Sequence, residues 1–264
     1  QPMQTAVEVT VLGSGSIGNA TVIRCGDDAI LIDAGFSGAE LQRRLDTAGV
    51  AAARIRGILI SHEHDDHTQA LRIFAKRNND IPAFANSLTM ERLQMMNKAP
   101  ENAIVFSNGS PFAIGPFQIE AFSVCHDAVD PVGFVIHCQD RKIGIATDLG
   151  HFGKLVPLKL KNSNVLIIES NHEHDLLRSS RRPAHLLHRI HSRRGHLSNK
   201  RAAELMAQVV GPGTQYLVTV HLSTDCNRPE LAESAARNCL KAMNQEQVEV
   251  LVASQDKVCR TITV

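Results

Sequence analysis

The feature that most constrains this chain is the run Ser61-His62-Glu63-His64-Asp65-Asp66-His67, which brings three imidazoles and several carboxylates together. Residues 57–61, which lead into it, are short, mostly aliphatic and without helical spacing, and this predicts a buried strand. Asp65 or Asp66 is then expected to cap a helix that reaches about Arg77. The run therefore lies on a predicted strand-to-helix turn.

The spacing within this run favours two metal ions. In an extended turn His62 and His64 point to the same side and can hold one ion, while Asp66 and His67 diverge toward a second. Neutral imidazole and carboxylate are ligands that Zn²⁺, Mn²⁺ and Fe ions accept. The alternative, a polar helix start with solvated histidines, would account for any one of these residues but not for the whole pattern.

The pattern His-x-His-x-Asp-His resembles the signature of the metallo-β-lactamase superfamily. This resemblance implies an α/β fold, an αββα sandwich of two mixed sheets flanked by helices, with a dinuclear site on one edge. A chain of 264 residues with 43% hydrophobic content can bury such a core. We expect one domain over residues 1–264, made of two similar halves that meet near 125–131. Because the superfamily includes lactamases, thioesterases, lactonases, oxidoreductases and nucleases, the motif does not define the substrate.

The resemblance also implies ligands at later strand ends. It makes His126 the third ligand of the first ion, Asp148 the ligand shared by both ions and His221 the last ligand of the second. A carboxylate such as Asp148 after a buried strand is costly unless it is paired or bound to metal. Asp33 is expected to brace the metal loop by bonding to a ligand. The expected sets are His62, His64, His126 and Asp148 for one ion, and Asp66, His67, Asp148 and His221 for the other.

This ligand set predicts metal-assisted hydrolysis. Two cations lower the pKa of a bridging water toward neutrality, so hydroxide is available near pH 7 without a separate general base. Each ion keeps an open position. The expected cofactors are two divalent metal ions, Zn or Mn, with Fe as a further option.

Residues 171–201 are locally basic, although the whole chain has a formal net charge of only +1. Eight Arg and Lys residues and six histidines lie there, against two acids, Glu173 and Asp175. Such a patch suits a phosphate backbone, and the alternative is a solvated helical face. In the glycine-rich loop 13–19, Ser16 and Asn19 either contact a substrate phosphate or only form a tight turn. The candidate substrate-binding residues are Ser16, Asn19, His172, Arg181, Arg182, Arg193 and Arg194.

The second half of the chain also resembles the phosphodiesterase branch typified by the transfer-RNA 3′-processing endonuclease. The resemblance rests on residues 166–170, 195–203 and 218–223, and it implies that Glu169 and His196 form a relay that protonates the leaving oxygen. An acid of near-neutral pKa helps to expel an alkoxide from a phosphodiester. The alternative is that His196 caps a helix beginning near Ser198. The expected catalytic residues are Asp66, Glu169 and His196.

A further resemblance, over almost the full chain, is to the bacterial WalJ/YycJ family. It rests on six motifs taken together: Gly13-Ser-Gly-Ser-x-Gly-Asn19, Ser61-His-Glu-His-x-Asp-His67, Ala146-Thr-Asp-Leu-Gly150, Glu169-Ser-Asn-His172, Gly195-His-Leu-Ser-Asn199 and His221-Leu-Ser-x-Asp225-x-Asn227. The family is described as two-metal, cytoplasmic 5′-to-3′ DNA exonucleases, which implies a nucleic-acid partner, DNA rather than RNA. With no Trp and one Tyr, the chain offers few stacking platforms, so base contacts should be independent of sequence.

Two other functions stay open. One is a small-molecule hydrolase of the same fold, such as a lactonase, β-lactamase or glyoxalase II-type thioesterase. The other is a nucleic-acid-binding regulator with vestigial activity. Oligomeric state is not predicted.

Six cysteines without a Cys-x-x-Cys pair favour a reduced, cytoplasmic protein. The N-terminal residues show no charged n-region or apolar h-region, and no apolar run approaches 18 residues. We therefore expect a protein that is neither exported nor membrane-spanning.

Periodicity and turn residues predict the remaining elements. The methionine pair Met95-Met96 is expected in the core. Helices are expected at 37–48, at 65–77 and after a cap at Ser87. Strands are expected at 7–12, 20–24, 29–32, 57–61, 81–85, 103–106, 117–124, 132–138, 142–146, 165–168 and 216–220.

Overall fold

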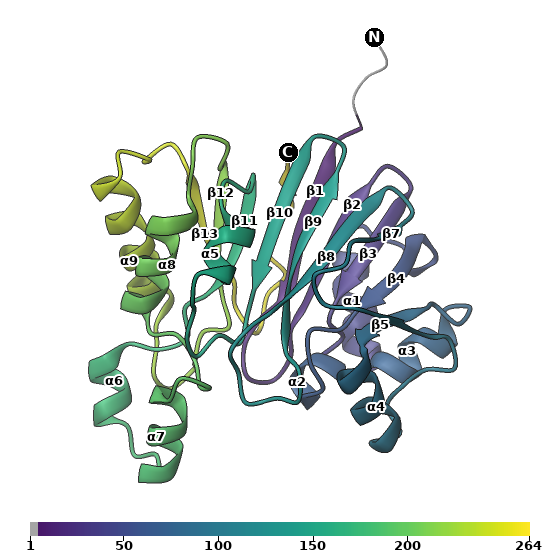
Figure 1. The fold of residues 1–264 in the computed structure, drawn as a ribbon, viewed down its shortest axis with the longest axis horizontal. Helices are drawn as coiled ribbons and strands as arrows, with labels where there is room; N and C mark the ends of the chain where they lie inside the picture. The colour runs from purple at the N-terminus through teal and green to yellow at the C-terminus, as the bar shows by residue number, and fades with distance from the viewer. Residues whose placement is uncertain (1–4) are drawn as a thin grey trace.

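The computed structural model describes residues 5–264; residues 1–4, which begin the expected 1–264 domain, lie outside the described residues. Two seven-stranded sheets pack face to face, and helices cover the outer face of each (Figure 1). The αββα sandwich expected from the sequence is confirmed. Among the described residues, no helix combines the length and apolar character that a bilayer span requires.

The first sheet mixes antiparallel and parallel pairing. Strands β1 to β3 and the C-terminal strand pair antiparallel, whereas β3 to β6 run parallel. In spatial order the sheet contains β14 (Ile262–Thr263), β1 (Val7–Gly13), β2 (Ala20–Cys25), β3 (Asp28–Ile32), β4 (Ile55–Leu59), β5 (Ala83–Asn86) and β6 (Ala103–Phe106).

The second sheet repeats this plan, with β7 to β10 antiparallel and β10 to β13 parallel. The chain leaves the first sheet after Phe106 and enters the second at Phe112, earlier than the boundary expected near 125–131. The last strand, β14, belongs to the first sheet again. In spatial order the second sheet contains β13 (Glu249–Val252), β12 (Tyr216–Val220), β11 (Val165–Glu169), β10 (Arg141–Ala146), β9 (Val132–Cys138), β8 (Phe117–Ser123) and β7 (Phe112–Ile114).

Side-chain alternation along the strands builds three apolar layers. In β11, Val165 and Ile167 join the cluster between the sheets, whereas Leu166 and Ile168 join the cluster beneath the helices. This parallel strand, buried on both faces, is therefore aliphatic up to Glu169, its last residue.

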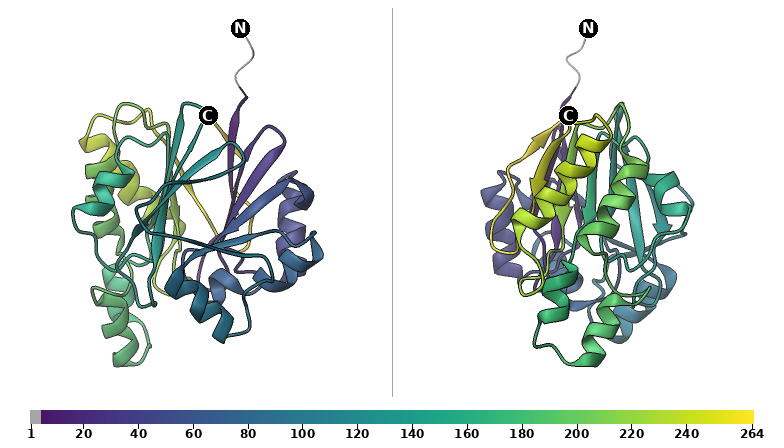
Figure 2. Two further views of the ribbon diagram at one scale, coloured as in Figure 1. Left: turned by 45° about the vertical axis from the view of Figure 1, so that its right-hand side comes forward. Right: turned by 90° about the vertical axis from the view of Figure 1, so that its left-hand side faces the viewer.

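Helices close the two outer layers (Figure 2). Helices α1, α3 and α4 cover the first sheet, and α5, α8 and α9 cover the second. Buried residues of each set of helices form one apolar cluster with residues of the sheet they cover. The helices are α1 (Gly38–Thr47), α2 (Asp65–Thr68), α3 (Leu71–Arg77), α4 (Ser87–Met95), α5 (Leu155–Leu160), α6 (His174–Ser179), α7 (Ala184–His191), α8 (Asn199–Val209) and α9 (Pro229–Ala242), and a 3₁₀ turn, η1, spans Ala52–Arg54.

The helix expected over 65–77 is broken into α2 and α3. Asn19 N donates to Asp66 O at 2.8 Å, and Ala70 N, the usual helical donor to that carbonyl, donates instead to Ala34 O at 2.8 Å. Asn19, just before β2, and Ala34, just after β3, thus bond to the backbone groups of Asp66 and Ala70 that would pair with each other in a continuous helix. Neither Asp65 nor Asp66 is the cap: the N-cap residue of α2 is His64, which makes no capping side-chain bond.

Two smaller predictions around α4 were wrong. The N-cap is Asn86, whose side chain accepts a bond from Thr89 N at 3.0 Å, rather than Ser87. Met95 is 79% exposed and Met96 36% exposed, because they lie at the end of α4, beyond the buried Met90 and Leu93.

Three residues that follow the strands β3, β10 and β12 have a left-handed backbone conformation. Asp33 follows β3, Asp148 lies just beyond β10 and His221 follows β12, with φ of 61°, 52° and 57°. Such φ values are uncommon in residues other than glycine, cost of order 1–3 kcal/mol each and cluster at functional sites. All three strand ends lie at one edge of the sandwich.

Helices α6 and α7 project from this edge, at the lower left of Figure 1. We call residues 174–191 the arm. Leu177 is the only buried residue of α6, and α7 has none. The arm is therefore weakly anchored by apolar packing.

Candidate metal centre and active site

The turn after β4 brings two imidazoles together as the spacing predicted. His62 Nε2 and His64 Nδ1 lie 3.0 Å apart, and Ser61 Oγ lies 3.0 Å from the other ring nitrogen of His62. His126, from the loop after β8, offers a third ligand atom, so that the three atoms lie within 4.8 Å of one another. Burial lowers the pKa of His62 well below its usual value, and nearby histidines add to this effect, so the ring is neutral and available to a cation.

A second group forms beside the first. Ligand atoms of Asp66, His67 and His221 lie within 4.8 Å of one another, with His67 Nε2 3.4 Å from Asp66 Oδ2. Asp66 and His67 lie on α2, which follows β4 of the first sheet, whereas His221 follows β12 of the second sheet. The group therefore bridges the two halves of the sandwich.

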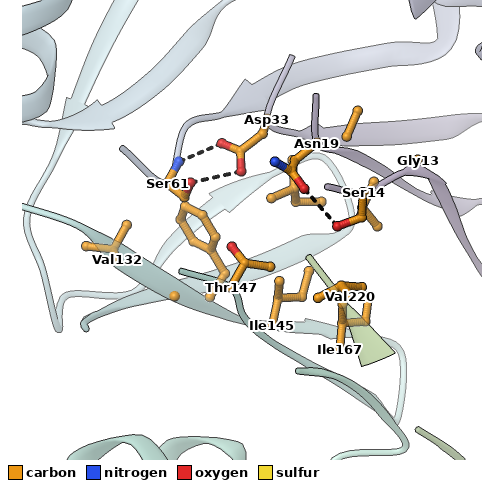
Figure 3. Close-up of a pocket in the computed structure, with 15 residues that line it drawn as sticks. Gly13, Ser14, Asn19, Asp33, Ser61, Val132, Ile145, Thr147, Ile167 and Val220 are labelled. Carbon is orange, nitrogen blue, oxygen red and sulfur yellow. Dashed lines mark hydrogen bonds between the residues drawn. The ribbon is translucent and has the colours of Figure 1, made fainter. Parts of the chain in front are cut away.

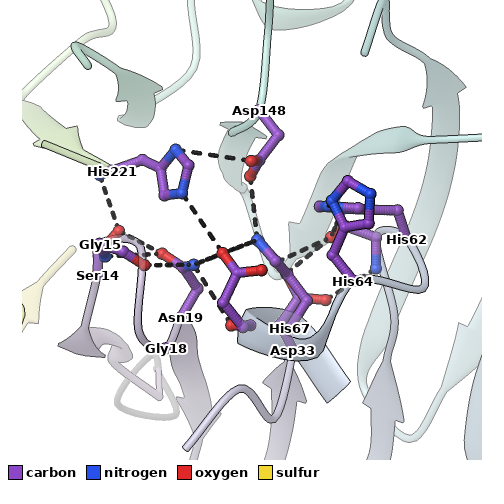
Figure 4. Close-up of polar contacts among 12 residues, drawn as sticks. Ser14, Gly15, Gly18, Asn19, Asp33, His62, His64, His67, Asp148 and His221 are labelled. Atoms are coloured by element: carbon purple, nitrogen blue, oxygen red, sulfur yellow. Dashed lines mark hydrogen bonds and ion pairs between the residues drawn. The ribbon is translucent and has the colours of Figure 1, made fainter. Parts of the chain in front are cut away.

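Asp148 lies between the two groups (Figure 4). Its Oδ2 is 3.1 Å from His67 Nε2, and its Oδ1 is 3.7 Å from His126 Nε2 and 3.6 Å from His221 Nδ1. The side chain is buried, which by itself raises its pKa, but His221 and His67 outweigh burial and hold the pKa well below the usual range. A carboxylate flanked by imidazoles of both groups can serve both.

The residues present fit divalent cations. Asp148 Oδ2 and His221 Nε2 are buried and make no hydrogen bond of good geometry, although Asp148 Oδ2 lies 3.1 Å from His67 Nε2. A buried polar atom without such a bond costs free energy. Both atoms belong to the groups just described. Imidazole with carboxylate is a donor set typical of Zn²⁺, Mn²⁺ and Fe ions.

A second layer of residues orients these ligands. His67 Nδ1 lies 2.7 Å from Asp33 Oδ2, and Ser61 N and Oγ both donate to Asp33 at 2.8 Å. A bond of this kind fixes the ring and directs its other nitrogen toward the cluster. Asp33 thus contacts both His67 and Ser61 behind the cluster.

Asn19 and Ser14 brace the same cluster from the glycine-rich loop. Asn19 Nδ2 donates to Asp66 Oδ2 at 3.2 Å, Ser14 Oγ donates to Asn19 Oδ1 at 2.7 Å, and His221 N donates to Ser14 Oγ at 2.9 Å. Asn19 is 5% exposed. Its amide therefore bonds behind the cluster and does not line the open pocket, which favours the turn alternative over a contact with a substrate phosphate.

A small cavity of about 20 Å³ lies between the sheets behind this layer (Figure 3). The polar residues Asn19, Asp33, Ser61 and Thr147 line it together with aliphatic residues such as Val220. A space of this size, with polar partners, suits one water molecule.

Glu169 connects the cluster to His196. Its Oε1 lies 2.7 Å from His196 Nδ1 and 2.8 Å from His221 Nδ1, and its Oε2 accepts from Leu149 N at 2.8 Å and Leu197 N at 3.0 Å. Burial alone raises the pKa of Glu169, but His196 and His221 overcome this and bring it to about 2. His196 therefore has a fixed orientation, with Nδ1 directed to an ionised carboxylate.

An open pocket of about 230 Å³ lies over the cluster. Of the expected substrate residues, Ser16, Arg182 and Arg194 line it, whereas Asn19, His172, Arg181 and Arg193 do not. Six of the expected ligands and catalytic residues line the pocket: His64, Asp66, His126, Asp148, His196 and His221.

Sequence reasoning missed part of the pocket wall. Leu186, Arg189 and Ile190 of α7 line it, and Arg189 pairs with Asp127 at 2.9 Å. The available signal was the spacing of the two apolar residues on a short basic segment, which gives a helix an apolar stripe that no core covers.

Gly35→Ala is expected to disturb the cluster. A Cβ at Gly35 would lie 1.6 Å from Asp66 O and 2.7 Å from Asn19 N, so the backbone of the metal loop would have to move. Overpacking of this kind costs about 1–3 kcal/mol or more. We expect a lower melting temperature and reduced bound Zn²⁺. Gly38→Ala, where the nearest atom is 3.8 Å away, is the matched control, and equal metal content in both variants would contradict the prediction.

Comparison with known proteins agrees with this fold. A family model described as "Beta-lactamase superfamily domain" matches residues 28–222. The crystal structure of the metallo-beta-lactamase fold protein YhfI from Bacillus subtilis superposes with a TM-score of 0.76 and 19% identity, covering 98% of this chain and 100% of that one. At this identity the likeness concerns the fold alone.

Two relatives are similar over most of their length. Exodeoxyribonuclease YycJ of Bacillus anthracis is 34% identical over 234 residues, which cover 88% of each chain. Exodeoxyribonuclease WalJ of Streptococcus pneumoniae serotype 2 is 32% identical over 235 residues, 88% of this chain and 87% of the relative. The chain therefore belongs to the beta-lactamase superfamily and, within it, to the family of YycJ and WalJ.

Proposed function

We propose that this protein is a metal-dependent hydrolase that cleaves phosphodiester bonds of nucleic acid, as a 5′-to-3′ DNA exonuclease without sequence specificity. The observation that carries the proposal is the Glu169–His196 pair, joined at 2.7 Å beside the metal-capable cluster in a pocket with arginines on its wall. Names of the family relatives support the same activity, since YycJ and WalJ are both exodeoxyribonucleases.

The cluster would hold two divalent ions, Zn or Mn, with Fe as a further option. His62, His64, His126 and Asp148 would hold one, and Asp66, His67, Asp148 and His221 the other. When bound, such ions supply Lewis-acid charge stabilisation and a water that ionises near neutral pH.

The remaining catalytic steps fall to the protein's own residues. His196, held by Glu169 at Nδ1, would donate a proton from Nε2 to the leaving oxygen, and general acid catalysis of this kind contributes about 10²–10⁴-fold. Asp66 would act both as a ligand and as a catalytic carboxylate. Asp33, Ser14 and Asn19 would keep the ligands oriented without touching the substrate.

Charge on the pocket wall favours a polyanionic substrate. Arg182, Arg189 and Arg194 line the pocket, and Ser16 lines it from the glycine-rich loop. Guanidinium groups suit phosphate oxygens because they form paired hydrogen bonds. A β-lactam nitrogen or a thiolate leaving group has less need of an acid such as His196.

A substrate panel tests this proposal. The protein, loaded with Mn²⁺ or Zn²⁺, is given single-stranded DNA, nitrocefin, a lactone and a thioester at matched concentrations. We expect kcat/KM for DNA to exceed the others. Faster turnover of nitrocefin, the lactone or the thioester would instead identify a small-molecule hydrolase, and DNA binding without cleavage in Zn²⁺, Mn²⁺ or Mg²⁺ would identify a regulator.

We further propose that residues 1–264 act as one domain in the cytoplasm. Both sheets contribute ligands to one cluster, so neither half holds a complete site. All six cysteines are free, as expected in a reducing compartment.

A further inference from the structure

Three histidines outside the centre described above converge where the arm joins the sandwich, and we propose that they form a separate site for a divalent transition-metal ion such as Zn²⁺. His172 follows β11, His174 is the first residue of α6, and His191 is the last residue of α7. One ring nitrogen from each lies within 4.8 Å of the other two. The three residues come from the body and from both helices of the arm.

His172 is the residue that points to a ligand. It is 2% exposed, and neither of its ring nitrogens has a hydrogen-bond partner. A buried imidazole with two unpaired nitrogens is rare and unfavourable unless something binds it. Its neighbours are the other two rings, with centroids 5.6 Å away for His174 and 5.4 Å for His191.

The chemistry of these side chains suits a metal. Burial lowers the pKa of His172 to about 4, with His191 and His174 adding to this against the opposing effect of Glu169, so the ring is neutral at pH 7. Neutral imidazole binds Zn, Cu, Fe and Ni, and three histidines with a water are a known Zn²⁺ arrangement. Zn–N bonds of about 2.1 Å separate the nitrogens by about 3.4 Å, so modest closure of the rings completes the site.

The site would fasten the arm. The helices of the arm bury little, and the rings of His174 and His191 stack with an interplanar angle of 9° instead of packing into a core. An ion bound to His172, His174 and His191 would join α6 and α7 to the end of β11. Because another face of α7 lines the pocket through Leu186, Arg189 and Ile190, the ion would also hold that wall in place.

This inference does not depend on the proposed function. None of the three histidines lines the pocket or belongs to the two groups around Asp148. The experiment therefore reads metal content and arm opening, and not nuclease activity.

Metal content is measured on the full chain, with His191→Ala as the test and His185→Ala as the control. Both histidines are exposed residues of α7, so neither substitution removes core packing. After Zn²⁺ loading and dialysis, we expect one fewer Zn²⁺ per chain in His191→Ala than in the wild type, and no change in His185→Ala. Equal Zn²⁺ in the wild type and His191→Ala would overturn the proposal.

A second measurement follows tryptic cleavage after Arg178 and Arg181, which lie in the arm. With Zn²⁺ at 100 times its dissociation constant, opening of the arm should be suppressed roughly 100-fold. We expect this protection in the wild type and His185→Ala but not in His191→Ala. In Asp148→Ala the protection should remain, because the two sites are separate; its loss there would contradict a distinct site.

Discussion

Asp148→Ala is expected to lose both catalytic ions and to reduce turnover of DNA to background. Asp148 is 2% exposed, and its two carboxylate oxygens lie within 3.1–3.7 Å of His67, His126 and His221. Removing it takes away the carboxylate that we propose both groups share, and it leaves buried imidazoles beside a cavity. Metal analysis of the purified variant checks the first half of the prediction, and a DNA cleavage assay checks the second.

Asp65→Ala is the matched control for this variant. Asp65 belongs to the same motif run, but its side chain is 84% exposed and pairs with Lys98 at the surface. A surface pair of this kind contributes about 0–1 kcal/mol, so metal content and activity should stay at the wild-type level. If Asp148→Ala held two ions and cleaved DNA normally, the assignment of a shared ligand would be wrong.

His196→Ala is expected to keep both metals and bind DNA with little loss, yet to slow DNA cleavage by roughly 10²–10⁴-fold. The reason is the loss of a proton donor for the leaving oxygen, because His196 is held at Nδ1 by Glu169 and lines the pocket. Capping of α8 does not explain His196, since the Ser198 side chain is the cap and accepts from Arg201 N at 3.3 Å.

The leaving group separates an acid from a structural residue. Bis(p-nitrophenyl) phosphate releases a phenolate that needs little protonation, so its hydrolysis by His196→Ala should fall much less than that of DNA. Comparable losses on both substrates would contradict the general-acid role. Loss of a metal ion in this variant would do so too, and would point to His196 as a ligand within the group that it forms with Asp148, Glu169 and His221.

Short-range patterns in the sequence predicted many of the strands and helices. Aliphatic strands such as β11 are legible because both faces are buried, and β9 was expected over 132–138, as observed. The local sequence could not predict the break in the helix over 65–77, because the break depends on hydrogen bonds to Asn19 and Ala34, which are distant in the chain. The order of strands in the sheets also depends on contacts between distant parts of the chain, since β14 near the C-terminus pairs with β1.

The candidate site shows a similar division. The spacing of His62 and His64 predicted that the two rings converge, because that geometry is set within one turn. Placing Asn19 correctly required the bonds it makes to Asp66 and Ser14, which no local pattern encodes. Arg189 was counted only as charge, because the direction in which α7 faces depends on how the arm meets the body.

Cleavage of end-labelled strands tests the proposed 5′-to-3′ DNA exonuclease activity. DNA and RNA strands labelled at the 5′ or the 3′ end are incubated with the Mn²⁺- or Zn²⁺-loaded protein, and product lengths are followed over time. We expect early release of short products from 5′-labelled DNA, progressive shortening of 3′-labelled DNA and slower cleavage of RNA, with none of these in Asp148→Ala. Intact DNA under every metal condition, or cleavage that persists in Asp148→Ala, would contradict the proposal.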